Sequence, residues 1–226
     1  MAISSFEEIV SENDSISFPH ENDLTWMFGK MYRRVFIEKH NIRFHPTSRA
    51  NEDAGFNGMC SLYINCSNGT ELINFSPVTT YIWCQSQDSI TRKNGCEYGY
   101  SGKENSSFHG YVENMIRVIT TLRNDSYIND TNNCIDVFCY DNMITLYFEY
   151  IKSAVCFSKE DEKLFIKWAK KYYQEVYKET EEKNIFNEND LREAFSASAN
   201  SQYQGFRMNG VIPHVTYYDF LKMIKE

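Results

Sequence analysis

The spacing of apolar residues changes from segment to segment along the first third of the chain. In residues 4–9 a serine precedes a pair of glutamates, which is typical of a helix start, and the polar run that follows ends this short predicted helix. Apolar residues return from Leu24 onward at near-helical spacing, which predicts a second helix from about Lys30 to Asn41. The chain is therefore expected to open with two helices.

The next segment predicts a brief strand and a third helix. Ile42 and Phe44 alternate with Arg43 as in a strand, and a proline ends this alternation. Asn51 is a suitable N-cap for a helix over residues 52–64, in which two acidic residues occupy the first turn and interact favourably with the helix dipole. Apolar side chains recur on one face of this helix, which predicts that it packs against a core.

Two strand-like runs follow, and helical patterns take over after them. Residues 71–75 and 79–84 contain β-branched and aromatic side chains, and Pro77 separates the two predicted strands. Beyond a loop, helical patterns cover residues 111–122, 134–157, 158–180, 190–199 and 216–225. We therefore predict an α/β fold with a sheet region over residues 1–104, followed by a mainly helical C-terminal region over residues 105–226.

The composition excludes several classes of protein. With 226 residues, 42% of them hydrophobic and 15% aromatic, the chain can fill a globular core. Its net charge of −8 argues against general nucleic-acid binding, which needs clustered lysine and arginine. No apolar run approaches the length of about 20 residues that spans a bilayer, so we expect no membrane span and a cytoplasmic location. The seven cysteines lack the spacing of a zinc site and are expected to be reduced thiols.

Four short segments carry the candidate chemistry, and their order along the chain gives them their meaning. They are Lys30-Met31-Tyr32-Arg33-Arg34, Ile42-Arg43-Phe44, Asn51-Glu52-Asp53 and Gln87-Asp88-Ser89-Ile90-Thr91-Arg92. In this order they resemble the acceptor half of a family 2 nucleotide-sugar glycosyltransferase with the A-type fold. The resemblance covers roughly residues 1–95, less than half of the chain. It implies that the sheet region is a partial A-type glycosyltransferase-like sheet.

The resemblance implies a catalytic role for the acidic pair at the start of the third predicted helix. Inverting glycosyl transfer needs a base that takes the proton of the acceptor hydroxyl while that oxygen attacks the anomeric carbon. Asp53 is the candidate base, with Glu52 beside it. The alternative is that both carboxylates only stabilise the first turn of the helix.

Candidate substrate-binding residues precede this pair. Trp26 offers an apolar ring face on which a sugar can stack, although burial in the core is the alternative role. Lys30 and Arg33 are candidates for holding a carboxylate or phosphate oxygen, or else are solvated. The resemblance implies that these residues face the cleft near the acceptor and the donor sugar.

Further candidates follow the second predicted strand. Gln87, Ser89 and Arg92 are expected to belong to a loop that closes over the nucleotide diphosphate, where the arginine fork would donate two hydrogen bonds to the leaving group. The alternative for Arg92 is a solvated side chain after a turn. His109 is a weak metal-ligand candidate, since a late histidine completes the metal site in some relatives.

The donor half that the resemblance also implies is not found in this sequence. No Asp-x-Asp segment and no phosphate-binding glycine loop precede Trp26. The implied cofactor is a Mn²⁺ or Mg²⁺ ion with a nucleotide-sugar donor, and the implied acceptor is a carbohydrate or another hydroxyl-bearing molecule. A sheet without its companion strands should expose an edge, so we expect a protein partner or a homo-oligomer to cover it. The alternative function is a noncatalytic binding or assembly protein that interacts through its helical C-terminal region.

Overall fold

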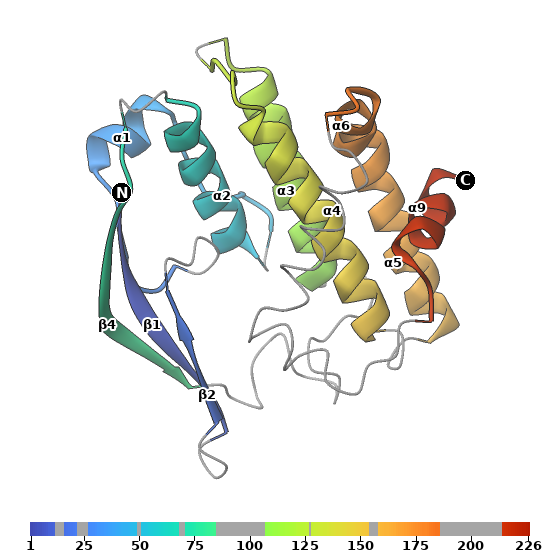
Figure 1. Ribbon diagram of the computed structural model, residues 1–226, viewed down its shortest axis with the longest axis horizontal. Helices are drawn as coiled ribbons and strands as arrows, with labels where there is room; N and C mark the ends of the chain where they lie inside the picture. The colour runs from blue at the N-terminus through green and yellow to red at the C-terminus, as the bar shows by residue number, and fades with distance from the viewer. Residues whose placement is uncertain are drawn as a thin grey trace.

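A small sheet and a group of long helices form the two sides of the molecule, and helix α2 (Glu52–Asn65) lies between them (Figure 1). This computed structural model describes residues 1–11, 16–21, 27–48, 51–67, 71–84, 107–126, 128–153, 158–185 and 214–226. The predicted mixed α/β class is therefore confirmed. The predicted domain boundary after residue 104 and the predicted helix over residues 190–199 lie outside the described residues.

Within the described residues the sheet has four strands, and β1 (Ala2–Ser11) is at its centre. On one side β1 pairs antiparallel with β2 (Ile16–His20) and, near its start, with β3 (Lys30–Met31). On the other side it pairs in parallel with β4 (Asn74–Cys84). Strands from three later segments of the sequence thus pair with β1.

The prediction of a helix over residues 4–9 is wrong, because this segment is the central strand. The serine and the glutamates that indicated a helix start lie in β1 between two neighbouring strands. These strands form hydrogen bonds with the backbone N–H and C=O groups of β1. Ile3 and Phe6 are almost fully buried at 2% and 1% exposure. Tertiary pairing and burial therefore override the local capping signal.

Strand β4 is one continuous element, so the predicted break at Pro77 is also wrong. The register between β1 and β4 shifts where Ser4 and Ser5 oppose Ser76 and Thr79, so that Pro77 is accommodated in an irregularity. Among the described residues β4 pairs only with β1, and a proline is tolerated on such an edge strand because no ladder bond is lost on the outer side. Every residue of β4 except the half-buried Trp83 is exposed.

The second predicted helix is shorter than expected. It is α1 (Arg34–Lys39), whereas Lys30 and Met31 belong to β3. Asn41 has a φ of 48°, a left-handed conformation that ends the helix as predicted. Residues 42–44 form no strand, and Ile42 is instead fully buried at 0% exposure under the end of α1.

The helical region agrees closely with the sequence pattern. Ser158 accepts a hydrogen bond from the backbone N–H of Asp161, and Thr216 accepts one from that of Asp219, both at 3.1 Å. A π-helical turn interrupts the long helix that begins after Ser158. The elements are α3 (Ser107–Arg123), α4 (Cys134–Ser153), α5 (Lys159–Tyr172), η1 (Tyr173–Tyr177), α6 (Lys178–Glu182) and α9 (Tyr217–Lys225).

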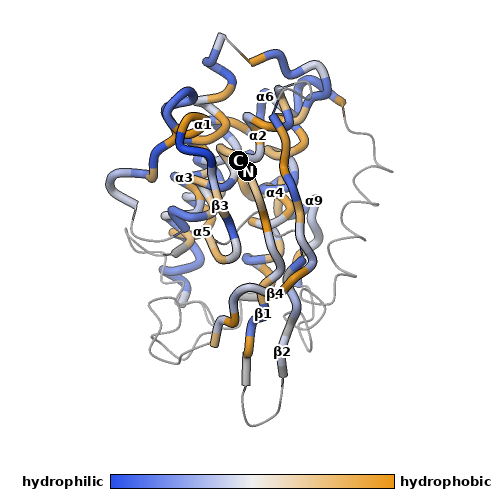
Figure 2. The backbone as a smooth tube through the Cα atoms, turned by 90° about the vertical axis from the view of Figure 1, so that its left-hand side faces the viewer, coloured by the Kyte–Doolittle hydropathy of each residue, from blue (hydrophilic) through white to orange (hydrophobic). Residues whose placement is uncertain are grey.

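One hydrophobic core connects these helices with α2. Met59 of α2, Ile119 of α3, Met143 of α4, Phe165 of α5 and Phe220 of α9 all belong to it and are almost fully buried. Figure 2 shows apolar positions along both the strands and the inner helices. In the part of the chain that is described, no helix is long and apolar enough to cross a membrane.

Two glycines of α2 give a matched test of how closely this helix packs. A Cβ atom at Gly55 would lie 2.6 Å from Asn114 Oδ1 and 2.9 Å from Asn114 Cβ, whereas one at Gly58 would lie 2.9 Å from Phe138 Cζ, the tip of a half-buried ring. We expect Gly55→Ala to lower the free energy of unfolding by about 1–2 kcal/mol, because overpacking exceeds the gain in helix propensity.

Gly58→Ala is the control for this prediction. The Phe138 ring can swing away, so we expect its unfolding free energy to remain within about 0.5 kcal/mol of the original chain. Urea unfolding of both variants measures the difference. Equal stabilities of the two variants would contradict a close contact between α2 and α3.

Candidate functional site

The first turn of α2 presents the acidic pair that the sequence analysis singled out. Asn51 precedes the helix with a φ of 56°, a left-handed conformation, and its side chain makes no capping bond to the helix. Asp53 Oδ1 accepts the backbone N–H of Ala54 at 2.8 Å. Glu52 and Asp53 are both half-buried. The predicted positions of the acidic pair and of Asn51 as the N-cap residue are confirmed, although the Asn51 side chain makes no capping bond.

Tyr32, from the upstream segment, contacts α2 one turn after the acidic pair. Its ring packs edge-on against Phe56 at a centroid distance of 5.3 Å, and its hydroxyl donates a hydrogen bond to Asn57 Oδ1. Burial raises the pKa of Tyr32, and the nearby Cys60 thiol and Asp53 carboxylate raise it further. Tyr32 therefore stays protonated at neutral pH and acts as a neutral donor within the electrostatic reach of Asp53.

Sequence analysis did not single out Asn57, although one signal for it was present. Asn57 is four residues after Asp53, and residues at this spacing share one face of a helix. The structure buries Asn57 completely, at 0% exposure, and uses it to hold the Tyr32 hydroxyl. A buried amide with a defined partner on the face of Asp53 fixes the position of Tyr32 beside the first turn.

The loop over residues 41–48 precedes this turn in the chain and is in contact with α3. Phe44 stacks on Phe56 at 4.5 Å. Asn114 Nδ2 donates to Ser48 Oγ at 2.9 Å, and Arg117 Nη2 donates to the carbonyl of Arg43 at 2.8 Å. The loop that leads to the acidic pair is thus held by side chains of the helical region.

His45 lies in the same loop and was not identified from the sequence. Its Nδ1 accepts the backbone N–H of Ser48 at 3.1 Å, which requires the unprotonated form of that nitrogen. Burial lowers the pKa of His45, and the Arg117 guanidinium lowers it further. His45 is therefore neutral at pH 7 and stabilises the loop as a hydrogen-bond acceptor.

The candidate substrate residues are only partly placed. Lys30 is half-buried and its Nζ lies 3.5 Å from the carbonyl oxygen of Phe28, while Arg33 is exposed just before α1. Lys30 and Arg33 thus flank Tyr32 in sequence. Four further candidates lie outside the described residues: Trp26, Gln87, Ser89 and Arg92.

His109 lies on α3 and interacts with an acidic and an aromatic side chain. Its Nε2 is 3.6 Å from Glu113 Oε1, and its ring is 4.1 Å from the ring of Trp168 on α5. Among the residues that the structure describes, no group of three or more His, Cys, Asp or Glu side chains could hold a metal ion. The described residues therefore do not fit a metal site, and we derive no chemical step through one.

No family model matches the chain, and neither a curated protein nor a solved structure matches it. The function therefore has to be inferred from the residues of the site. Fold alone would not settle it, because one architecture supports many activities.

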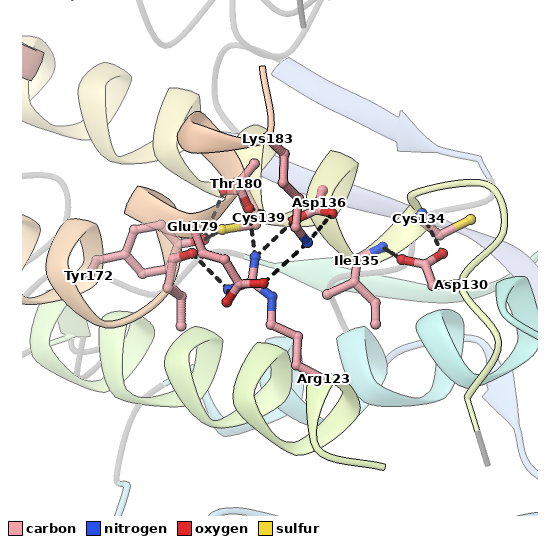
Figure 3. Close-up of polar contacts among 11 residues, drawn as sticks. Arg123, Asp130, Cys134, Ile135, Asp136, Cys139, Tyr172, Glu179, Thr180 and Lys183 are labelled. Carbon is pink, nitrogen blue, oxygen red and sulfur yellow. Dashed lines mark hydrogen bonds and ion pairs between the residues drawn. The ribbon is translucent and has the colours of Figure 1, made fainter. Parts of the chain in front are cut away.

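A second polar cluster lies between α3, α4 and α6 (Figure 3). Asp136 is 5% exposed and accepts hydrogen bonds from Arg123 Nη2 at 2.8 Å and from Lys183 Nζ at 2.8 Å. Thr180 donates to the same carboxylate at 2.7 Å. Arg123 Nη1 also donates to the carbonyl of Val176, within the π-helical turn, at 2.8 Å. We call Arg123, Asp136, Thr180 and Lys183 the Asp136 cluster.

The Asp136 cluster is better explained by stability than by catalysis. Burial alone would raise the pKa of Asp136, but hydrogen bonds from Lys183, Thr180 and Arg123 outweigh it and hold the pKa below its ordinary value. The carboxylate thus stays charged and is already engaged by three partners from two other helices. Such a group fixes the packing of the helices and does not transfer protons at neutral pH.

Proposed function

We propose that this chain supplies the acceptor-binding and catalytic-base portion of an inverting nucleotide-sugar glycosyltransferase, with Asp53 as the base. The observation that carries the proposal is the contact of Tyr32 with Phe56 and Asn57 of α2, one turn after Asp53. Tyr32 and Asp53 belong to different segments of the family resemblance, and burial, the Cys60 thiol and the Asp53 carboxylate raise the pKa of Tyr32. This contact between two segments of the resemblance, one turn from the half-buried Asp53, supports the proposal.

The proposed reaction assigns a role to each of these groups. Asp53 takes the proton of the acceptor hydroxyl as its oxygen attacks the anomeric carbon, and the nucleotide diphosphate leaves from the opposite face. The bond from the Ala54 N–H and the positive end of the α2 dipole hold the carboxylate in place. The neutral Tyr32 hydroxyl would add a polar group near this carboxylate, and its hydrogen bond to Asn57 holds it in position.

The remaining candidate residues would contact the sugar and the donor. Trp26 would stack on a sugar ring, and Gln87, Ser89 and Arg92 would contact the diphosphate of the donor. A Mn²⁺ or Mg²⁺ ion would accompany that diphosphate. The nucleotide pocket itself would belong to a donor half that this sequence does not contain.

A noncatalytic binding or assembly protein is the second candidate, and the surface of β4 favours it. The exposed large apolar side chains of the described residues lie mainly between residues 31 and 82, and they include Phe75, Val78, Tyr81 and Ile82 on β4. Among these exposed apolar residues of the described part, only Val137 and Tyr218 belong to the helices after residue 105. An interaction surface would therefore lie on the edge of the sheet, where a partner strand or a second copy could add.

Calorimetric titration of the chain tests the proposal against this alternative. One panel contains mono- and oligosaccharides, and a second contains nucleotide sugars and free nucleotides with Mn²⁺. We expect saccharide binding that Asp53→Asn weakens, because the carboxylate would accept a bond from the acceptor hydroxyl. Nucleotide-sugar binding would place a donor site within this chain. If neither panel binds, the glycosyltransferase proposal fails and the assembly function is preferred.

A further inference from the structure

Two cysteines that are far apart in sequence meet where α2 ends and α4 begins. Cys66 follows the last residue of α2 and is 6% exposed, while Cys134 is the first residue of α4 and is half-buried. The Cys66 thiol and the backbone N–H of Cys134 both donate to the same carboxylate oxygen of Asp130. The described cysteines 60, 66, 84, 134 and 139 are all free thiols. The two cysteines therefore lie side by side as free thiols that share one acceptor.

Asp130 fixes the relative position of the two thiols. Its Oδ1 accepts the backbone N–H of Cys134 at 2.7 Å, and its Oδ2 accepts that of Ile135 at 2.9 Å (Figure 3). The same Oδ1 is the acceptor for the Cys66 thiol at 3.7 Å. The Asp130 carboxylate thus binds the start of α4 and contacts both cysteines, which fixes the two residues relative to each other.

We propose that Cys66 and Cys134 form a reversible disulfide that locks α2 to α4. The oxidant is a small-molecule disulfide of the glutathione class. The Cys134 thiolate attacks one of its sulfurs, which forms a mixed disulfide and releases the first small thiol. The Cys66 thiolate then attacks the Cys134 sulfur and releases the second. Two protein thiols are oxidised, one small disulfide is reduced to two thiols, and the two protein protons end on them.

The environment of the pair makes this reaction slow and dependent on pH. Burial, the Asp130 charge and the Cys134 thiol together raise the pKa of the Cys66 thiol to about 12. Burial and Asp130 also raise the pKa of Cys134. Because the thiolate is the nucleophile, the rate of oxidation should increase about tenfold for each pH unit between pH 7 and pH 9. Cys134 reacts first because it is the less buried of the two.

Peptide mapping after oxidation tests the proposal. The folded chain is incubated with oxidised glutathione at pH 8.5, alkylated, digested and analysed by mass spectrometry, with a dithiothreitol-treated sample as the reduced reference. We expect a peptide that links Cys66 to Cys134, and a melting temperature about 10 °C above that of the reduced chain, since the bond closes a long loop. Dithiothreitol should reverse both changes.

Serine variants separate this pair from the other thiols. Cys66→Ser and Cys134→Ser should each abolish the linked peptide and the rise in melting temperature. Cys84→Ser, at an exposed position on β4, should retain both. The proposal is overturned if glutathione stays on Cys134 without forming the link, or if the link forms only after unfolding in urea. Peptide mapping of the chain without substitutions tests for the link between Cys66 and Cys134 even if a serine variant folds poorly.

Discussion

Asp136→Asn is expected to lower the free energy of unfolding at pH 7 by about 3 kcal/mol. The substitution keeps the size of the side chain but removes the charge that Arg123 and Lys183 share. Arg123 is only 14% exposed, so it would remain as a buried cation with too little compensation. Urea denaturation followed by circular dichroism measures the loss.

Glu179→Gln is the control for this prediction. Glu179 contacts the same Arg123 and Lys183, both at 3.2 Å, but it is 57% exposed. Water screens an exposed pair, so we expect a loss below about 1 kcal/mol. Equal effects of the two variants would mean that burial of the Asp136 cluster is not what makes it stabilising.

The same cluster predicts a dependence of stability on pH. The pKa of Asp136 is lower in the folded chain than in the unfolded chain, so its contribution is fully present above the unfolded value of about 4. The contribution is lost as the pH falls through the folded value. The difference in stability between the original chain and Asp136→Asn should therefore shrink below about pH 4. A difference that stays constant down to pH 2 would contradict a charged Asp136.

Asp53→Asn is expected to reduce the rate of sugar transfer by about 10²- to 10⁴-fold, the usual contribution of a general base. The amide cannot take the proton of the acceptor hydroxyl, although it can still accept the Ala54 N–H. The measurement is product formation by mass spectrometry with saturating donor and acceptor, in the preparation in which the chain is active. Folding should change little, because a carboxylate in the first turn contributes only about 0.3–1 kcal/mol.

Asp219→Asn is the matched control for Asp53→Asn. It makes the same chemical change in the first turn of α9, at an exposed position. We expect it to leave the transfer rate unchanged. If Asp53→Asn lowers only the stability and leaves the rate intact, the acidic pair only supports the helix start and another group is the base.

The acidic pair and the helical region were predictable because local signals agreed with the tertiary environment. The helices predicted over residues 158–180 and 216–225 begin directly after Ser158 and Thr216, whose side chains cap them. The helix over residues 52–64 also begins where it was expected. In each case apolar periodicity, a polar start and burial favour the same structure.

The sheet and the contacts of the site were not predictable in this way. The local pattern of residues 4–9 favours a helix start, and only pairing with β2 and β4 makes this segment a strand. Tyr32 reaches α2 because β3 and α1 place it there, and no local signal encodes that contact. The positions of Trp26 and Arg92 relative to Asp53 stay predictions.

The sequence by itself determined the long helices, the start of α2 with Asp53 in its first turn, and the order of the segments that resemble a glycosyltransferase. These features depend on residues within a few positions of each other, so that capping and periodicity are sufficient. The tertiary structure alone decided that residues 2–11 are the central strand, that Tyr32 contacts α2, that Asp136 binds three helices together, and that Cys66 and Cys134 share Asp130. Each of these requires contact between distant parts of the chain, which is set by the burial of the whole core.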